Sequence, residues 1–325
     1  MLAKQTRTLA VRSLLLFLSL GGYTLSSYSA SEYSFFPKPY CEHSKTIEKS
    51  YDAAKLKSLA LNVLAGDLLM KGTSAQNIVF QGKVCTDSPD LLPHIQLEEE
   101  LSGDHLVLTV IIPRKEYDPE YAFVDIEISI PENLKTVLAD SSGDIEASQI
   151  SLAKIDDDSG DIRVEQNRTP LVIHDSSGDI TVMSSDHSIE VTDSSGDIRL
   201  RDIRSSINIP TDASGDILIS TIQGPVQIEV DSSGDIEIDD VESDVSIGMD
   251  SSGDIEIERI KGSVYIKNDG SGSIEISEVS GNVQVGYVGS GRLTVRDVGG
   301  DFTVAGKGSG GIRNYNVKGK VDVPR

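Results

Sequence analysis

The segment that decides the fold is DSSGDIEI, which occupies Asp231–Ile238 and recurs unchanged at Asp250–Ile257. Related segments recur ten times, with their glycines spaced by 17, 18, 18 and then 19 residues. In every copy a serine precedes the glycine, and Ile or Leu follows it by two positions. This periodicity predicts a repeat protein. The ten glycines are Gly143, Gly160, Gly178, Gly196, Gly215, Gly234, Gly253, Gly272, Gly291 and Gly310.

Apolar and polar residues alternate within one copy, and this is the period of a β-strand. Ile236 and Ile238 flank Glu237, and a second alternating run follows at Val245 and Ile247. A glycine or serine turn separates the two runs, and no 3.6-residue helical period is present. Each copy therefore predicts two short strands, which together make one coil of a β-solenoid.

Stacking of coils must stabilise this fold, because one coil cannot bury its own row of Ile and Val. We predict an all-β β-helix, or β-solenoid, with about 19 residues per coil and a length of about 48 Å for ten coils. Branched aliphatic side chains fill a narrow interior well, which agrees with the absence of Trp. We expect the glycine to supply a positive φ at the corner, and the preceding serine to hydrogen-bond along the stack.

Three parts of the chain are predicted. A basic start, an apolar run at residues 14–20 and small residues before position 31 indicate a signal peptide over residues 1–30. An uncleaved anchor is the alternative, although the run is shorter than the roughly 20 residues that span a bilayer. Residues 31–139 are expected to form an irregular β cap with a degenerate first coil at Ala65–Leu68. Residues 140–325 are expected to form the ten-coil solenoid.

The cap is expected to cover one edge of the solenoid, which otherwise offers unpaired backbone groups to other chains. Its strands are predicted near residues 78–81, 95–101, 105–112 and 122–130. Cys41 and Cys85 are the only cysteines of the chain, and an oxidising compartment favours a disulfide between them. Two cysteines and five scattered histidines show no spacing typical of a metal site.

The charge is uneven along the chain. It has 29 basic and 52 acidic residues, a net charge of −23, which argues against a general nucleic-acid binder. Acidic and basic residues number 17 and 13 over residues 1–139, 31 and 9 over 140–275, and 4 and 7 over 276–325. The net charges are therefore −4, −22 and +3. Charged side chains on solvated turns and outward strand positions keep a rod soluble, and this explains the uneven charge. The alternative is a dipolar rod that associates through its ends or binds cationic surfaces.

Two columns of aspartates follow from the repeat, one directly after the glycine and one three residues before it. Stacked coils place these like charges about 5 Å apart, so their repulsion must be offset. Capping of the backbone N–H groups of the same turn is the favoured explanation. Calcium is the alternative, with Asp216, Asp235 and Asp254 as its candidate ligands. No other cofactor is predicted.

The repeated Ser-Gly-Asp-Ile motif behind a secretion signal resembles the bacterial "putative adhesin" family of repeat proteins. The resemblance covers about residues 55–325, including Gly66–Leu68 and the Ile-Pro-Glu-Asn-Leu stretch at Ile130–Leu134. It implies a right-handed single-stranded β-helix outside the cytoplasm. Ser273, Arg292 and Gly311 replace the motif aspartate, so a role of that residue does not extend to the last three coils.

We expect a non-catalytic extracytoplasmic rod, periplasmic or at the cell surface, that binds an envelope protein or a glycan or associates with its own kind. A cation-responsive sensing component of the envelope is the alternative, and a polysaccharide-active β-helix enzyme is a third. Near-constant repeat lengths leave no room for the long loops that wall a catalytic cleft, and no histidine recurs beside the serines and aspartates. Tyr265, Tyr287 and Tyr315 fall in different columns of the repeat, so sugar binding by aromatic stacking is not favoured.

Overall fold

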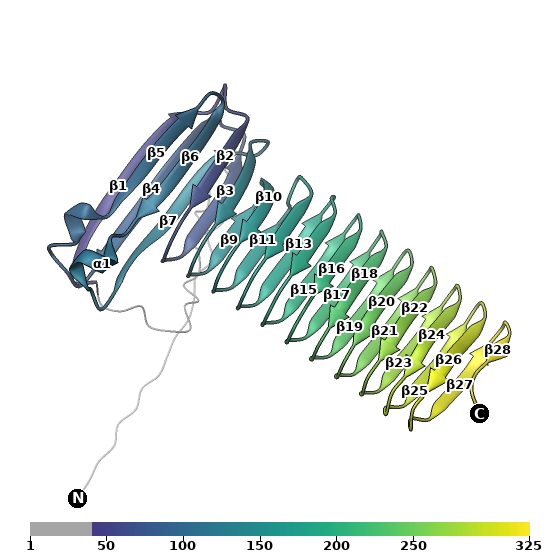
Figure 1. Cartoon of the computed structure of the whole chain (residues 1–325). Helices are drawn as coiled ribbons and strands as arrows, with labels where there is room; N and C mark the ends of the chain where they lie inside the picture. The colour runs from purple at the N-terminus through teal and green to yellow at the C-terminus, as the bar shows by residue number, and fades with distance from the viewer. Residues whose placement is uncertain (1–40) are drawn as a thin grey trace, which may run out of the picture. The chain divides into compact units, whose positions relative to one another are not determined.

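Each repeat folds into two strands that belong to different sheets, as in β19 (Ile236–Val241) and β20 (Val245–Asp250). The computed structural model describes residues 41–325, so the predicted signal peptide lies outside the described residues. Figure 1 shows the paired strands stacked coil upon coil along the C-terminal part of this unit. The β-solenoid of about ten turns with roughly 19 residues per turn is confirmed.

Two 14-stranded sheets contain all the strands described. In spatial order, the first sheet holds β1 (His43–Asp52), β4 (Asn77–Thr86), β7 (Ala122–Pro131), β3 (Leu68–Thr73), β9 (Ile145–Ser148), β11 (Ile162–Glu165), β13 (Ile180–Ser185), β15 (Ile198–Ile203), β17 (Ile217–Ile222), β19, β21 (Ile255–Ile260), β23 (Ile274–Val279), β25 (Leu293–Val298) and β27 (Ile312–Val317).

The second sheet holds β28 (Val321–Asp322), β26 (Phe302–Lys307), β24 (Val283–Val288), β22 (Val264–Asp269), β20, β18 (Val226–Asp231), β16 (Ile207–Thr211), β14 (Ile189–Thr192), β12 (Leu171–His174), β10 (Ser151–Asp156), β8 (Lys135–Ala139), β2 (Ser58–Asn62), β6 (His105–Ile111) and β5 (Gln96–Ser102). The described residues also form one 3₁₀ turn, η1 (Leu92–His94), and one short helix, α1 (Arg114–Tyr117). None of the described helices is long and apolar enough to cross a membrane.

Parallel register places equivalent residues of successive coils beside one another. Ile236 of β19 pairs with Ile217 of β17 and with Ile255 of β21, and all three side chains are buried. Glu237, the next residue, is exposed. The alternation read from the sequence thus separates the core of the solenoid from its surface.

The strands β2 and β3 form a coil that the chain inserts out of order. β2 pairs with β6 and β8, and β3 pairs with β7 and β9, so this coil lies between elements that follow it in sequence. Leu68 is in register with Ile145, at the position of the repeat isoleucine. The boundary between cap and solenoid at residue 140 stays a prediction.

Antiparallel strands end both sheets on the N-terminal side. β4 pairs antiparallel with β7 and with β1, while β5 pairs antiparallel with β6. The sequence predicted β4 to β7 but not β1. The edge strand β5 carries three consecutive glutamates, Glu98–Glu100, and such charge protects an edge from pairing with other chains.

The corner glycine has the expected positive φ, and the serine before it makes the expected hydrogen bond along the stack. Gly234 has a φ of +129°, and a Cβ added there would lie 1.7 Å from the carbonyl oxygen of Gly215 in the preceding coil. Ser233 donates a hydrogen bond from Oγ to the carbonyl oxygen of Ala213, 3.2 Å away. Positive φ values recur at the motif glycines from Gly143 to Gly272, and serine hydrogen bonds of this kind recur over the same coils, as predicted. The prediction is wrong for Gly291 and Gly310, which do not have a positive φ.

Cys41 and Cys85 form a disulfide, with Cα atoms 5.5 Å apart. It fastens the chain just before β1 to the paired strand β4. An intramolecular disulfide is typical of proteins outside the cytoplasm. The cross-link closes a loop of 44 residues, which restricts the unfolded chain by about 4 kcal/mol on the entropy model.

Native protein is expected to show no alkylatable thiol before reduction and two after it. Mass analysis of alkylated protein under non-reducing and reducing conditions measures this directly. Reduction is also expected to lower the melting temperature, because the unfolded chain gains freedom. Two alkylatable thiols in unreduced protein would contradict the disulfide.

Candidate functional site

The aspartates that follow the corner glycine form an exposed ladder along the stack. Oδ1 of Asp216 accepts a hydrogen bond from the backbone N–H of Asp235, at 2.9 Å, and Oδ1 of Asp235 accepts one from Asp254, at 2.8 Å. The ladder ends where Ser273 donates its N–H to Asp254. The prediction that these carboxylates cap their own turn is wrong, because parallel stacking brings the N–H of the next coil within reach of each carboxylate.

This ladder gives each exposed carboxylate a structural partner. Among the described residues, no group of three or more His, Cys, Asp or Glu side chains is placed to hold a metal ion. The arrangement favours a backbone role for Asp216, Asp235 and Asp254, and calcium binding by these three residues stays a prediction to be tested.

Calcium is expected to change the melting temperature very little. The melting temperature of the full-length protein would be compared in millimolar calcium and in chelator. If calcium did bind, a concentration a hundredfold above its Kd would add roughly 2.7 kcal/mol per site to the free energy of unfolding. A rise of many degrees in calcium, abolished by changing Asp216, Asp235 and Asp254 to Asn, would make cation binding the leading function.

The aspartates three residues before the glycine form a second, buried column. The side chains of Asp212, Asp231, Asp250 and Asp269 are 0% exposed. Asp231, Asp250 and Asp269 follow one another in parallel register at successive coils. The full column comprises Asp140, Asp157, Asp175, Asp193, Asp212, Asp231, Asp250 and Asp269.

Capping of the same turn is confirmed in part of this buried column. Oδ1 of Asp193 accepts the backbone N–H groups of Ser194 and Ser195, at 2.6 and 3.2 Å. Asp140 and Asp175 cap their own turns in the same way. The other oxygen of each of these carboxyls is buried and has no partner.

Burial raises the pKa of Asp250 to about 7, and the neighbouring charges of Asp231 and Asp269 add to the effect. Burial likewise raises the pKa of Asp231 to about 6 and that of Asp212 to about 7. Both side-chain oxygens of Asp231 and of Asp250 are buried without a hydrogen-bond partner, which adds to the free-energy cost of charging either carboxyl. The buried column therefore retains protons near neutral pH, and this lowers the repulsion within it.

The buried column predicts that stability falls as the pH rises. The unfolded chain loses these protons near the ordinary Asp pKa of 3.8, whereas folded Asp250 keeps its proton up to about 7. The contribution of these carboxyls to stability is therefore greatest below about pH 4 and is lost as the pH rises to about 7. We expect the melting temperature to fall by several degrees between about pH 5 and 7.5, as measured by circular dichroism.

Replacing Asp231, Asp250 and Asp269 with Asn should raise the melting temperature at pH 7.5 and reduce its dependence on pH. Asn keeps the size of the side chain and has no charge to bury. The matched control changes the exposed residues Asp216, Asp235 and Asp254 to Asn, and should leave the dependence of the melting temperature on pH unchanged. If the melting temperature of the Asp231, Asp250 and Asp269 variant depends on pH as strongly as that of the wild type, these carboxyls do not hold the protons.

A second corner of each coil contains a residue other than glycine with positive φ. These residues lie six positions after the motif glycine and have φ between 52° and 59°. Sequence reasoning missed this column because the residue type changes from coil to coil while only the backbone conformation is shared. Its members are Gln149, Gln166, Ser184, Asp202, Thr221, Asp240, Arg259, Glu278, Asp297 and Asn316.

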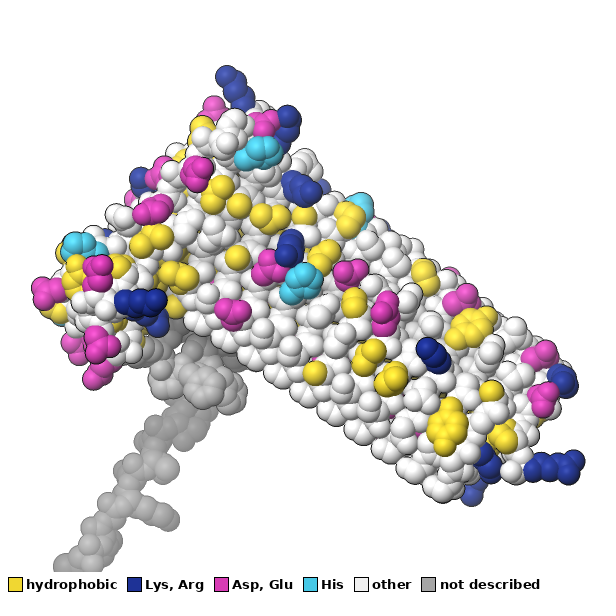
Figure 2. Space-filling view, viewed as in Figure 1, with side chains coloured by type: hydrophobic (Ala, Val, Ile, Leu, Met, Phe, Trp, Pro, Cys, Tyr) yellow, Lys and Arg dark blue, Asp and Glu magenta, His cyan; other side chains and the backbone are white. Residues whose placement is uncertain are grey.

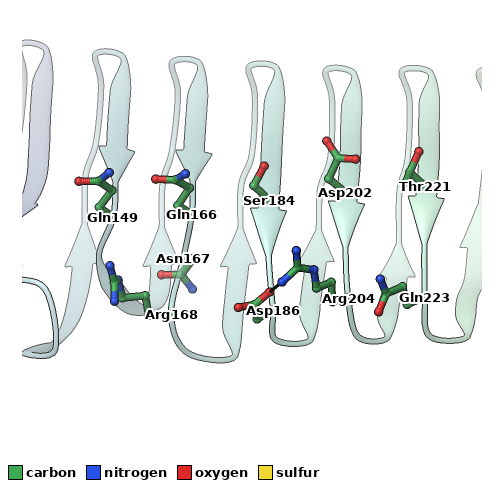
Figure 3. A pocket seen from close by; sticks show the side chains of 10 residues that line it. All are labelled: Gln149, Gln166, Asn167, Arg168, Ser184, Asp186, Asp202, Arg204, Thr221 and Gln223. Atoms are coloured by element: carbon green, nitrogen blue, oxygen red, sulfur yellow. Dashed lines mark hydrogen bonds and ion pairs between the residues drawn. The ribbon is translucent and has the colours of Figure 1, made fainter.

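A polar groove of about 830 Å³ runs along the first five members of this column. Figure 3 shows two rows of side chains, one at the positive-φ positions and one on the turns that follow. Every lining residue is polar or charged. They are Gln149, Gln166, Asn167, Arg168, Ser184, Asp186, Asp202, Arg204, Thr221 and Gln223.

The groove lies beside the shortest coil. In that coil only Ile150 separates Gln149 from β10, whereas four residues, 167–170, separate Gln166 from β12. The missing turn leaves a hollow that the longer turns of the following coils border. The sequence analysis considered only clefts that are walled by long loops, and this shallow groove forms without any inserted loop.

Internal contacts hold part of the groove lining in place. Asn167 is 2% exposed, and it bonds to both the N–H and the carbonyl of Leu152. Arg204 pairs with Asp186 at 3.0 Å, as Figure 3 shows, and Arg168 pairs with Glu132 at 3.0 Å. The sequence signal that could have revealed the groove is the 17-residue spacing, together with the polar residues Asn167 and Ser185 where the other coils have Ile or Val.

The face of the solenoid in Figure 2 carries scattered hydrophobic side chains between polar ones. Met249, Tyr265 and Tyr287 are 44%, 39% and 43% exposed and lie on β20, β22 and β24. Tyr265 is in register with Gln284, and Tyr287 is in register with Asn268. The two rings therefore occupy different columns, as the sequence predicted, and do not form a continuous stacking platform.

A family model described as Toastrack DUF4097 matches residues 42–233. The comparison with curated proteins found no match.

Three solved structures show low similarity to the chain. A putative cell adhesion protein from Clostridium sporogenes is 10% identical over 84% of this chain and 99% of its own, with a TM-score of 0.31. A putative adhesin from Bacteroides fragilis is 13% identical over 83% and 97%, with a TM-score of 0.27. A putative lipid binding protein from Parabacteroides distasonis is 14% identical over 87% and 98%, with a TM-score of 0.30. Scores this low carry no argument about function.

Proposed function

The chain belongs to the Toastrack DUF4097 family, and from this premise we propose that it is a non-catalytic binding rod of the cell envelope or cell surface. The finer assignment to adhesin-like proteins with Ser-Gly-Asp-Ile repeats is part of this proposal. The chain acts outside the cytoplasm after removal of residues 1–30, and the disulfide between Cys41 and Cys85 supports that location.

The observation that carries the proposal is the polar groove on a regular stack of coils. A stack of equivalent coils presents the same backbone at fixed intervals, and this suits the binding of an extended partner. The groove supports binding more than catalysis, because its two carboxylates are already paired. Asp186 pairs with Arg204, and Asp202 pairs with Arg201. Paired carboxylates on the surface make poor general acids or bases.

Crosslinking in intact source cells tests this function. A photoreactive residue would replace Gln223 in the groove or, as a control, Gln284 on β24 of the other sheet. An envelope component captured at Gln223 and not at Gln284 is the expected result. Cytoplasmic location of the chain, or equal capture at the two positions, would contradict the proposal.

A further inference from the structure

We propose that the polar groove binds a single extended strand of a neutral, hydroxyl-rich glycan. The inference rests on the proposed function and names the class of ligand for the same groove. It follows from the chemistry of the lining residues, their charge balance and their spacing along the stack.

The lining offers both hydrogen-bond donors and acceptors that are available to a ligand. Within the part of the chain that the structure describes, Gln149, Gln166 and Gln223 make no side-chain hydrogen bond. An amide side chain presents two N–H donors and one carbonyl acceptor, and the hydroxyls of Ser184 and Thr221 serve as either. A sugar hydroxyl also donates and accepts, so it matches this lining.

The charge of the groove favours a neutral ligand. Its charged residues are two arginines and two aspartates, and Arg204 and Asp186 neutralise each other. Arg168 is neutralised by Glu132, and Asp202 by Arg201. An anionic polymer would need unpaired cations here, and the acidic chain around the groove would repel it.

The spacing of the lining favours a polymer that runs along the stack. Gln149, Gln166, Ser184, Asp202 and Thr221 occupy the same position in five successive coils. Four coil steps of about 4.8 Å give a contact length of about 19 Å, which spans several sugar units. In later coils the same corner carries Asp240, Arg259, Glu278 and Asp297, so the run of mainly neutral side chains ends where the groove ends.

A folded protein partner fits this groove less well. The buried centre of a protein interface is rich in aromatic and aliphatic side chains, and none lines the groove. Hydrogen bonding without aromatic stacking predicts weak binding per sugar unit. Affinity should therefore rise with the length of the glycan as more coils are engaged.

Calorimetric titration of the full chain with neutral linear oligosaccharides tests the inference. Trimers and hexamers derived from cellulose, xylan and mannan are suitable probes, with polygalacturonate and a Gly-Ser-Thr-rich peptide as comparators. We expect at least one neutral hexamer to bind, to bind more tightly than its trimer, and to be preferred to both comparators. Preference for either comparator, or no binding of any neutral hexamer, would overturn the inference.

Variants locate the site. Changing Gln149, Gln166 and Gln223 together to Ala should weaken hexamer binding at least about tenfold, equivalent to about 1.4 kcal/mol. The matched control changes Gln227 and Gln284, exposed glutamines of the second sheet, to Ala and should bind as the wild type does. If the triple variant melts early, Gln223→Ala alone should still weaken binding by about threefold. Unchanged binding in a folded groove variant would overturn the site.

The two proposals fail in different ways. If every neutral hexamer fails to bind but a component of the envelope still crosslinks at Gln223, the glycan inference is wrong and the binding function stands. If neither occurs, the proposed function is wrong as well.

Discussion

Replacing Ile236 with Asp is expected to unfold the centre of the solenoid. Ile236 is 1% exposed and lies in register between Ile217 and Ile255, which are equally buried. An Asp at this position would be enclosed by aliphatic side chains of both neighbouring coils, where a carboxylate lacks water and a partner. The expected loss of unfolding free energy exceeds about 4 kcal/mol, among the largest effects of a single substitution.

Urea unfolding followed by circular dichroism measures this loss. The control is Glu237→Lys, one residue further along β19, because the side chain of Glu237 is exposed. It should change the unfolding free energy by less than about 0.5 kcal/mol. Equal losses in the two variants would contradict the assignment of inward and outward faces.

Replacing Gly234 with Ala is expected to be about as damaging, for a different reason. The φ of +129° lies where L-residues rarely occur, and the added Cβ would be 1.7 Å from the carbonyl oxygen of Gly215. Backbone on both sides is fixed by the stack, so neither atom can move away without breaking hydrogen bonds between coils. We expect a loss of several kcal/mol or failure to fold.

Gly311→Ala is the matched control, since a Cβ at Gly311 would meet no atom within 4 Å. Thermal unfolding of both variants gives the comparison. The strained-corner account is wrong if Gly234→Ala melts at the same temperature as the wild type and as Gly311→Ala.

Local periodicity explains what the sequence predicted well. The alternation around Ile236 specifies an inward face, and the recurrence of Gly234 and its equivalents specifies a corner that only glycine fits. These properties recur in most of the copies, so each copy supports the interpretation of the others. The fold class could therefore be predicted before any strand was placed in space.

Long-range pairing and burial could not be predicted in the same way. Nothing in Ser58–Asn62 or Leu68–Thr73 indicates that these strands insert between elements later in the chain. Both aspartate columns lie close to the motif glycine in sequence. The path of the backbone through the corner turns Asp250 inward, where it is buried, and Asp254 outward, where it is exposed. The groove depends on one short coil beside longer ones, which is a relation between turns and not a motif.

The most direct test of the account is to measure how distance grows with repeat number. Glu146, Glu237 and Glu275 occupy equivalent exposed positions on β9, β19 and β23, so spin labels on cysteines introduced there leave the core intact. Glu146 and Glu237 are five strands apart in the first sheet, and Glu146 and Glu275 are seven apart. Pulsed electron paramagnetic resonance should give separations near 24 and 34 Å, a rise of about 4.8 Å per coil. Separations that do not grow with repeat number, or that grow by about 10 Å per repeat as for packed sheets, would contradict a solenoid built of one coil per repeat.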